Sequence, residues 1–277
     1  MKIKFTILGA TGFIGSHLVK FLRNKDIECY APDVRNDDIF NDYLGNVIYA
    51  IGVSDFLNRP FTTVDAHVCI LRKLLEKSQF DSFVYLSSGR PYYQSDSTHE
   101  DDELRVNPSN PNDLYNISKL MGESLCINCG KENIKIVRPS NVVGIGSPPN
   151  LFIPSIIHDA VYEKKITLHS TLDSEKDYVY ITDVVNILFE ISIKGKPDIY
   201  NIAMGKNTKS KEIIDEILNL TGCDIEISKN AKRFSSPLIS IDKLNTQFGF
   251  KPSSIVDKLD EIVSHYQQEK ISFNSKD

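Results

Sequence analysis

A tyrosine and a lysine four residues apart form the first pair in this sequence whose types and spacing could carry out chemistry. They are Tyr115 and Lys119, and on a helix they would share one face. An ammonium group near a phenol favours the phenolate and lowers the pKa of the phenol from its usual value of about 10. Such a tyrosine can move a proton to or from the oxygen of a sugar or an alcohol. The alternative interpretation is an ordinary exposed pair on a helix.

A serine at the end of an expected strand strengthens this hypothesis. The segment FVYLSS, residues 83–88, indicates a buried strand with Ser88 just past its end. Ligands bind at the carboxyl ends of the strands in an open parallel sheet, so a hydroxyl here could hold the reacting oxygen beside Tyr115. The alternative is that Ser88 is simply a strand-end residue.

A glycine-rich segment near the start of the chain predicts a dinucleotide site. Gly9, Gly12 and Gly15 follow the first expected strand and open the first expected helix. Glycines let the backbone turn tightly and approach a pyrophosphate, whose charge the helix N-terminus favours.

Asp33, at the end of the second expected strand, could bind the adenosine ribose and repel a 2′-phosphate, which favours NAD over NADP. Arg35 weakens that preference, and the alternative for Asp33 is a surface loop residue.

Strands and helices alternate along the first half of the chain, and these elements must position the candidate residues. The rhythm predicts βαβ units, a parallel sheet and therefore an α/β fold. Few residues separate the second strand from the third, so we expect that part of the sheet to be truncated or irregular. The expected strands are Ile3–Leu8, Ile27–Ala31, Asn46–Ile51, Ser82–Ser87 and Ile134–Val137, and the expected helices are Phe13–Asn24, about 62–78 and Asp113–Cys129.

The rhythm loosens after Val137, where prolines and glycines mark a long loop. Further strands are expected at Asp177–Ile181 and Ile199–Ile202, with helices over about 154–163, 182–193, 209–221, 240–248 and 255–268. From this pattern we expect a dinucleotide-binding domain at 1–165 and 177–203 and a substrate-binding region at 166–176 and 204–277.

The composition restricts the classes of partner. The chain has 277 residues, and 32 Lys and Arg against 37 Asp and Glu give a formal net charge of -5. That balance gives no support for a basic face that binds nucleic acid. No apolar run approaches the roughly 18 residues of a membrane-spanning helix, and the run near the N-terminus is too short for a secretory signal. We therefore expect a cytoplasmic protein with no nucleic-acid and no membrane partner.

The cysteines and histidines do not form a recognisable metal or disulfide pattern. Five cysteines are too few for a disulfide-stapled module of this length. Cys126 and Cys129 form a single CxxC late in an expected helix, where two small helical residues are the simpler interpretation. The six histidines do not cluster with cysteines or carboxylates at ligand spacing, so we expect no metal.

Taken in order, the segments of this chain resemble the extended short-chain dehydrogenase/reductases, in the nucleotide-sugar epimerase/dehydratase branch. The resemblance covers nearly the whole chain, and its ordered set of segments is far more specific than any single motif. The segments are GATGFIG at 9–15, Asp33, VIYAIG at 47–52, FVYLSS at 83–88, YNISK at 115–119, IVRPSNVVG at 136–144, KDYVYITDVV at 176–185, IYNIA at 199–203 and FGFKP at 248–252.

The resemblance implies a Rossmann doubly wound parallel sheet with a small C-terminal α/β substrate domain. It also implies a bound NAD, with NADP possible, a nucleotide-diphosphate sugar as substrate, and a homodimer. The implied catalytic residues are Ser88, Tyr115 and Lys119, and the implied substrate-binding residues are Ser88, Arg90, Asn141, Lys176 and Arg233. The implied cofactor-binding residues are Gly9, Thr11, Gly12, Phe13, Ile14, Gly15, Asp33, Arg35, Ala50, Ile51, Gly52, Tyr115, Lys119 and Pro139. For Lys176 and Arg233 the alternative is solvated surface charge.

Departures from the family pattern exclude one of the reactions that members of the family catalyse. Dehydratases of the family carry an acidic pair directly after the catalytic hydroxyl, where this chain has Gly89 and Arg90. Elimination therefore lacks its acid and base, which excludes 4,6-dehydration. The Asn that the family usually carries before its fourth helix corresponds to Asp65 in this chain.

Three classes of function remain: a reductase of a nucleotide-activated 4-keto-6-deoxy sugar, a 4-epimerase that keeps its NAD bound, and a non-enzymatic cofactor sensor. The complete triad argues against the sensor. The compact substrate region favours the reductase over the epimerase. A decarboxylase or another carbonyl reductase is a further, less favoured alternative.

Overall fold

The computed structural model describes residues 4–35 and 38–274 and divides the chain into two compact units. The first unit consists of Met1–Pro139, Val184–Ile202 and Ser240–Phe250, and the second of Ser140–Asp183, Ala203–Ile239 and Lys251–Asp277. Each unit has its own sheet and its own helices.

A parallel sheet forms the centre of the first unit. Its six described strands lie in the order β2-β1-β3-β4-β5-β9, and all neighbouring pairs are parallel. The predicted α/β fold with a parallel sheet is therefore confirmed. The strands are β1 (Lys4–Leu8), β2 (Glu28–Tyr30), β3 (Asn46–Tyr49), β4 (Ser82–Leu86), β5 (Ile134–Pro139) and β9 (Ile199–Ile202). Ile3, which was expected to begin the first strand, lies outside the described residues.

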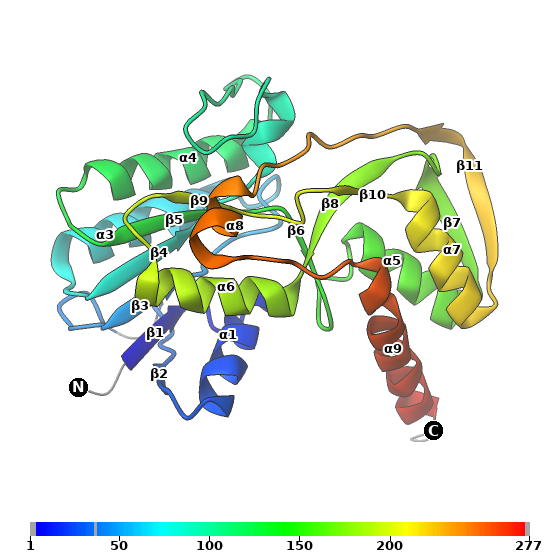
Figure 1. Ribbon diagram of the computed structural model, residues 1–277, viewed down its shortest axis with the longest axis horizontal. Coiled ribbons are helices and arrows are strands. Elements are labelled where there is room, and N and C mark those ends of the chain that lie inside the picture. The colour runs from blue at the N-terminus through cyan, green and yellow to red at the C-terminus, as the bar shows by residue number, and fades with distance from the viewer. Residues whose placement is uncertain (1–3, 36–37, 275–277) are drawn as a thin grey trace. The chain divides into compact units, whose positions relative to one another are not determined.

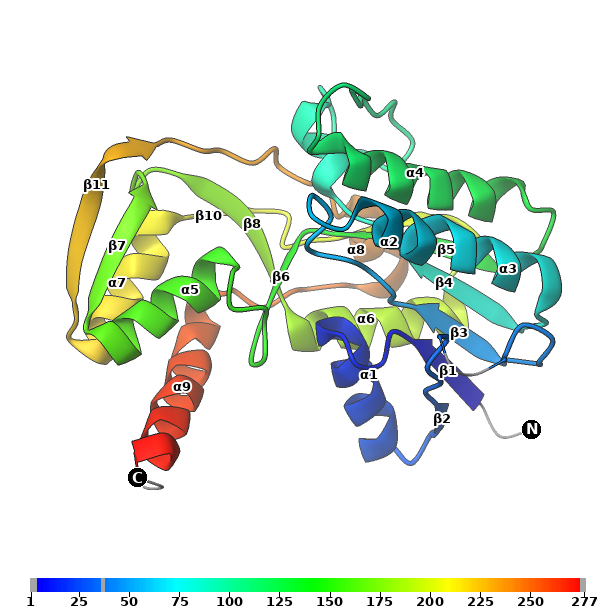
Figure 2. The same cartoon turned by 180° about the vertical axis from the view of Figure 1, so that it is seen from behind.

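Helices cover both faces of this sheet. Figures 1 and 2 show α3 and α4 on one face and α1 and α6 on the other. The α-helices of the unit are α1 (Phe13–Asn24), α2 (Pro60–Val64), α3 (Ile70–Lys77), α4 (Asp113–Asn128), most of α6 (Ile181–Lys194) and α8 (Asp242–Phe248). A π-helical turn, Asp65–Cys69, joins α2 to α3, and a 3-10 helix covers Arg90–Gln94.

Burial on both faces explains why the strands are almost uninterrupted apolar runs. All five residues of β4 are buried, and the last three residues of β3 are buried as well. A strand with helices on both sides has no solvent face, so it shows no alternation of apolar and polar residues. On α1, Leu18 and Leu22 are buried one turn apart, which is the helical period that the sequence shows.

The sheet is irregular at the edge where the sequence predicts it. Strand β2 has only three residues. The described residues between β2 and β3 form no strand and contribute only an isolated bridge, from Tyr43 to Gln79. The short interval between the second and third expected strands thus leaves room for little beyond a loop.

The second unit has two smaller sheets. Strands β10, β8 and β6 form one, in that order, and β11 pairs in parallel with β7 to form the other. The strands are β6 (Asn141–Val143), β7 (Lys165–Ser170), β8 (Glu175–Tyr180), β10 (Asn207–Lys209) and β11 (Asp224–Lys232). The helices are α5 (Phe152–His158), a π-helical turn (Asp159–Glu163), α7 (Ser210–Thr221), a 3-10 helix (Val256–Lys258) and α9 (Leu259–Asn274).

The boundaries of the two units differ from the expected domains because of two pairings. Strand β6 pairs with β8, which carries 140–165 and 177–183 into the second unit. Helix α8 packs against β9, and Lys243 donates hydrogen bonds to Asp198 and to the carbonyl of Ile199, so 240–250 belongs to the first unit.

No helix in the described ranges is long and apolar enough to cross a membrane.

A buried ion pair fastens α4 to β5 in the first unit. Arg138 donates two hydrogen bonds to Glu123, of 3.0 and 2.7 Å, and both side chains are 4% exposed. The remaining donors of Arg138 reach the hydroxyl of Tyr92 at 2.8 Å and the carbonyl of Glu100 at 3.1 Å. Almost all N–H donors of the guanidinium are thus paired with buried acceptors.

Removing one partner should leave a buried charge without compensation. We expect Glu123→Ala to lower the free energy of unfolding by about 3–5 kcal/mol. The matched control is Glu76→Ala, which removes an exposed i,i+4 pair with Arg72 and should cost under about 1 kcal/mol. Urea denaturation measures both changes, and equal losses in the two variants would contradict the assignment.

Candidate active site

The predicted serine and tyrosine lie together at the carboxyl end of β4. Ser88 follows the last residue of β4 by two positions, and Tyr115 lies in the first turn of α4. The Ser88 hydroxyl is near enough to the phenol of Tyr115 to lower the pKa of the phenol by hydrogen bonding. The backbone N–H of Arg90 also donates to the Ser88 hydroxyl, at 3.1 Å. The two hydroxyls are therefore held side by side at the sheet edge where the sequence predicts ligand binding.

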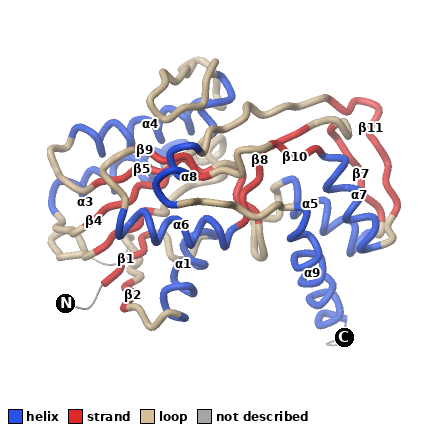
Figure 3. The backbone as a smooth tube through the Cα atoms, in the orientation of Figure 1, coloured by secondary structure: helices blue, strands red, loops and turns tan. Residues whose placement is uncertain are grey.

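A buried aspartate fixes the start of α4 and with it the position of Tyr115. The carboxylate of Asp113 accepts hydrogen bonds from the Gln94 side chain, the Asn107 backbone N–H and the Asn116 side chain, at 2.8–3.0 Å. Burial raises the pKa of Asp113, but these hydrogen bonds outweigh it, and the pKa is lowered. The carboxylate therefore anchors both ends of the long loop before α4, which Figure 3 shows as coil.

Lys119 is buried and is bound to the neighbouring strand. Its ammonium donates a hydrogen bond of 2.8 Å to the carbonyl of Leu86 and lies 5.3 Å from the ring centre of Tyr85. Burial lowers the pKa of Lys119 to about 7, although the charge of Glu123 acts in the opposite direction. The charge of Lys119 is thus sensitive to pH near neutrality.

Arg90 is the cation that acts on Tyr115 in the described structure. Its guanidinium carbon lies 4.8 Å from the ring centre of Phe56 and 5.6 Å from that of Tyr115. Burial raises the pKa of Tyr115, while the Ser88 hydrogen bond and the charge of Arg90 lower it, and the net direction is upward. The effect of Lys119 on this pKa stays a prediction; in the described structure its ammonium donates to the carbonyl of Leu86.

Sequence reasoning overlooked a histidine in this cluster. His67 is fully buried in the π-helical turn, and its ring meets the Tyr115 ring edge-on at 5.2 Å. Its Nδ1 lies 2.8 Å from the hydroxyl of Ser118. A π-helical turn shifts the helical phase, so counting with a period of 3.6 does not place His67 on this face.

The glycine loop fits a pyrophosphate by the shape of its backbone. Gly9 has a φ of 88°, and a Cβ there would lie 2.8 Å from the backbone of Ala50. A Cβ on Gly15 would lie 2.1 Å from the carbonyl oxygen of Gly9. Helix α1 starts at this loop with no side-chain cap and no acidic residue in its first turn, so its N-terminal N–H groups remain available to an anion.

The other predicted cofactor residues are spread along the same edge of the first sheet. Thr11, Phe13 and Ile14 lie in the loop and the first turn of α1, and residues 50–52 directly follow β3. Pro139 ends β5, and its carbonyl accepts a hydrogen bond of 2.9 Å from the N–H of Gly89. Each of these residues lies at the carboxyl end of a strand or in the segment that follows it.

Asp33 and Arg35 are bound to each other. Two side-chain hydrogen bonds of 2.9 and 3.0 Å join the guanidinium to the carboxylate, and both side chains are exposed. The hydrogen bond to Asp33, together with its charge, raises the pKa of Arg35. The carboxylate that should repel a 2′-phosphate is therefore neutralised by the next charged residue, which makes the choice of cofactor depend on both.

The remaining predicted substrate residues lie in the second unit. Asn141 on β6 donates a hydrogen bond of 2.7 Å to the carbonyl of Asp177, and Lys176 is on the neighbouring strand β8. The Lys176 ammonium lies 4.9 Å from the ring centre of Phe234, and burial lowers its pKa. Arg233 instead makes an exposed ion pair of 3.2 Å with Asp173.

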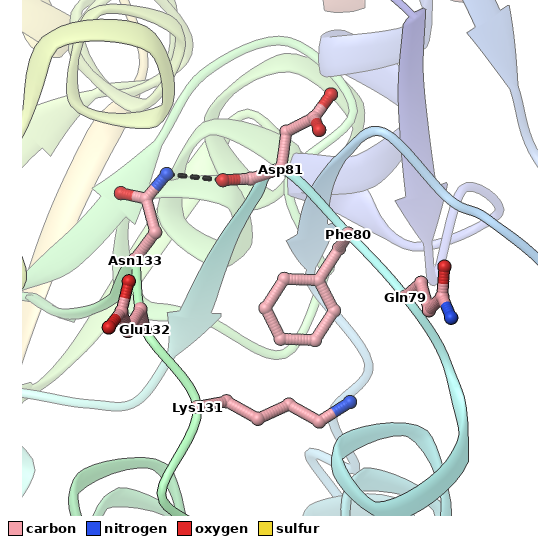
Figure 4. A pocket seen from close by; sticks show the side chains of 6 residues that line it. All are labelled: Gln79, Phe80, Asp81, Lys131, Glu132 and Asn133. Atoms are coloured by element: carbon pink, nitrogen blue, oxygen red, sulfur yellow. Dashed lines mark hydrogen bonds between the residues drawn. The ribbon is translucent and has the colours of Figure 1, made fainter.

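A shallow pocket lies at the opposite end of the first sheet (Figure 4). Its six lining residues directly precede β4 and β5, at 79–81 and 131–133, and a hydrogen bond joins Asn133 to the carbonyl of Asp81. None of the predicted site residues lines it. Because ligands of parallel sheets bind at the carboxyl ends of the strands, we do not assign the active site to this pocket.

The described ranges contain no group of three or more His, Cys, Asp or Glu side chains that could hold a metal ion. The absence of a metal requirement stays a prediction.

Comparison with known proteins identifies the family. The model of the NAD dependent epimerase/dehydratase family matches residues 5–203, and the chain belongs to this family. It is therefore an enzyme of the extended short-chain dehydrogenase/reductase class, as the resemblance implied.

The relatives include reductases of nucleotide sugars. The GDP-6-deoxy-D-mannose reductase of Pseudomonas aeruginosa is 26% identical over 263 residues, which cover 84% of this chain and 85% of the relative. The dTDP-4-dehydro-6-deoxyglucose reductase of Escherichia coli is 27% identical over 208 residues, 70% of this chain and 63% of the relative. Other matches are nucleotide-sugar dehydratases and an epimerase.

A solved structure confirms the fold. RMD from Pseudomonas aeruginosa, complexed with NADPH, superimposes with a TM-score of 0.78 and covers 96% of this chain and 99% of that chain at 23% identity.

Replacing Arg90 should raise the pKa of Tyr115 further. In Arg90→Gln the side chain loses the charge that favours the phenolate, so deprotonation should require a higher pH. The measurement is the tyrosinate absorbance on alkaline titration, taken as the difference from Tyr115→Phe in each background. Arg105→Gln, which removes an exposed arginine paired with Asp96, serves as the control. A titration of Tyr115 that is the same with and without Arg90 would refute this assignment.

Replacing Asp33 should change the preference between the two cofactors. Asp33→Asn removes a negative charge and releases Arg35, so affinity for NADP(H) relative to NAD(H) should rise by about tenfold, or about 1.4 kcal/mol. Arg35→Ala should shift the ratio in the opposite direction. Calorimetric titration with each reduced cofactor measures both ratios. The hypothesis fails if the Asp33→Asn protein keeps the wild-type ratio.

Proposed function

We propose that this enzyme is an NAD(P)-dependent reductase of a nucleotide-activated 4-keto-6-deoxy sugar. The observation that carries the proposal is the placement of Ser88 beside Tyr115, where it lowers the pKa of the phenol, with Arg90 next to the ring. That pair can bind and protonate a carbonyl oxygen, while Arg90 stands where a dehydratase of the family carries an acid. The similarity to GDP-6-deoxy-D-mannose reductase along 84% of this chain supports the same class of substrate.

The residues of the first unit suit a nicotinamide dinucleotide. The glycine loop and the uncapped start of α1 would bind its pyrophosphate, and Asp33 with Arg35 would meet the adenosine ribose. Lys119 and Gly52 would lie at the nicotinamide ribose. The cofactor, once bound, supplies the hydride for reduction of the ketone.

The protonation of Tyr115 favours reduction over oxidation. In reduction, Ser88 and Tyr115 hold the carbonyl oxygen, and Tyr115 gives its proton as negative charge grows there. The net rise in the pKa of Tyr115 keeps this proton in place at neutral pH. Oxidation of an alcohol needs the phenolate, which the same rise disfavours. Reductase activity should therefore fall as the pH rises through the pKa of Tyr115.

The second unit would bind the nucleotide diphosphate. Lys176 carries a positive charge among aromatic side chains, and Asn141 lies on the adjacent strand. A cation of this kind can bind a phosphate oxygen as a point charge. Arg233 could contribute only by leaving its pair with Asp173.

We also propose a homodimer, as the family resemblance implies. Helices α2 and α4 pack together and expose large apolar side chains, with Phe61 85%, Met121 50% and Ile127 62% exposed. A second copy of the chain could cover them. The cytoplasmic location stays a prediction.

The test is the stoichiometry of the cofactor. With a nucleotide 4-keto-6-deoxyhexose, we expect one reduced nicotinamide to be consumed for each deoxyhexose formed, as measured by absorbance and chromatography. Tyr115→Phe should lower turnover by at least about 100-fold, because proton transfer of this kind contributes roughly 10²–10⁴.

The alternative is an NAD-dependent 4-epimerase, which uses the same three side chains. Interconversion of two C4-epimeric nucleotide sugars without net cofactor consumption would establish the epimerase and overturn the reductase. Near wild-type turnover in Tyr115→Phe would remove this residue from the mechanism of either.

A further inference from the structure

The imidazole of His67 presents two nitrogens to very different surroundings. The side chain is fully buried in the π-helical turn and faces α4. Nδ1 is hydrogen-bonded to Ser118, while Nε2 has no hydrogen-bond partner among the described residues. A buried polar atom left without a partner destabilises the folded state, so this nitrogen needs an explanation.

The hydrogen bonds of Ser118 determine the tautomer of His67. The Ser118 hydroxyl has one proton, and it donates this proton to the carbonyl of Tyr115 at 2.9 Å. Its oxygen must therefore accept the proton of His67 Nδ1, at 2.8 Å. His67 is the Nδ1–H tautomer, and its Nε2 carries a bare lone pair that can only accept.

His67 stays in this neutral form because its ring is not protonated in the working range of pH. Burial, with the charge of Lys119 adding to it, lowers the pKa of His67 to about 2. The ring stays neutral across the working range of pH, so Nε2 remains an acceptor throughout.

Lys119 supplies a donor on the other side of the same position in the fold. A Cβ on Gly52 would lie 3.9 Å from His67 Nε2 and 4.0 Å from Lys119 Nζ, so the two nitrogens border the same position. An ammonium has three protons, and in the described structure one of them goes to Leu86. A buried acceptor and a buried donor thus border the position where Gly52 has no side chain.

We propose that His67 is a positioning residue for Lys119: its Nε2 accepts a hydrogen bond from one water molecule beside Gly52, and this water in turn accepts a hydrogen bond from the Lys119 ammonium. The charged form of the lysine is thereby stabilised for cofactor binding. Through Nδ1 and Ser118, the same ring fixes the turn of α4 that carries Tyr115. The proposal rests on the cofactor-binding role of Lys119 within the proposed function.

The consequence is a dependence of cofactor affinity on pH. The titratable groups that face Lys119 are Glu123 on its own helix, Tyr85 on β4, Tyr115 and His67. A hydrogen bond to the ammonium favours the charged form and raises the pKa of Lys119. Losing the Nε2 acceptor should lower that pKa, so the lysine would lose its charge at a lower pH.

Two substitutions of His67 distinguish the role of Nδ1 from the role of Nε2. In His67→Asn the amide nitrogen occupies the place of Nδ1 and can still donate to Ser118, but the acceptor near Lys119 is gone. In His67→Gln the amide oxygen reaches the place of Nε2, but the donor to Ser118 is lost. Each variant therefore controls for the other.

The experiment is calorimetric titration with NADH of the full-length protein and both variants at pH 6 and pH 8. We expect His67→Asn to bind about tenfold more weakly than wild type at pH 8 and almost equally at pH 6. We expect His67→Gln to show the pH dependence of the wild type. Variants that share one pH dependence would overturn the proposal, as would a wild type that binds no cofactor at either pH.

A second measurement does not require the His67 variants to fold. The ¹⁵N resonances of the imidazole should report the neutral Nδ1–H tautomer, and the Nε2 resonance should move in Lys119→Met. An unmoved Nε2 resonance would refute the contact. Neither experiment contains a sugar, so a failure of the reductase assay with the expected titration would reject the proposed function and leave the role of His67 standing.

Discussion

Lys119 donates a hydrogen bond to the carbonyl of Leu86, and this bond joins α4 to the carboxyl end of β4. Tyr115 lies about one helical turn before Lys119, and Ser88 lies two residues after Leu86. The bond therefore sets the register between helix and strand that brings the two hydroxyls together. Arg90, which follows Ser88 by two residues, is a cation that lowers the pKa of Tyr115 from the same place.

One carboxylate links the stability of the first unit to the charge of its active site. Glu123 forms the buried ion pair with Arg138, and its charge also raises the pKa of Lys119. Because the same group serves both cations, its loss would destabilise the packing of α4 on β5 and favour neutral lysine at the same time. The charge of Lys119 therefore cannot be altered through Glu123 without disturbing the core.

Those parts of the fold and the site that depend on local sequence patterns can be predicted from the sequence. The parallel strands, the glycine loop and the positions of Ser88 and Tyr115 follow from apolar runs and fixed spacing. Strand β11 escapes prediction because it is largely exposed: only Ile225 and Ile227 alternate with polar residues, and neither is buried. The influence of Arg90 on Tyr115 and the exposed pair of Arg233 with Asp173 depend on where long side chains settle, which spacing does not encode.

The π-helical turn at Asp65–Cys69 has a consequence for how this chain compares with others of its family. A π-helical turn closes over one residue more than an α-helical turn, so it is a one-residue insertion within a helix. Deleting one residue would restore regular winding, while α2 and α3 on either side would keep the faces that they present to their neighbours. His67 would then no longer face α4, although every strand would keep its place. A single-residue gap at this turn in a sequence alignment therefore separates chains that direct a side chain toward the lysine from chains that turn it away.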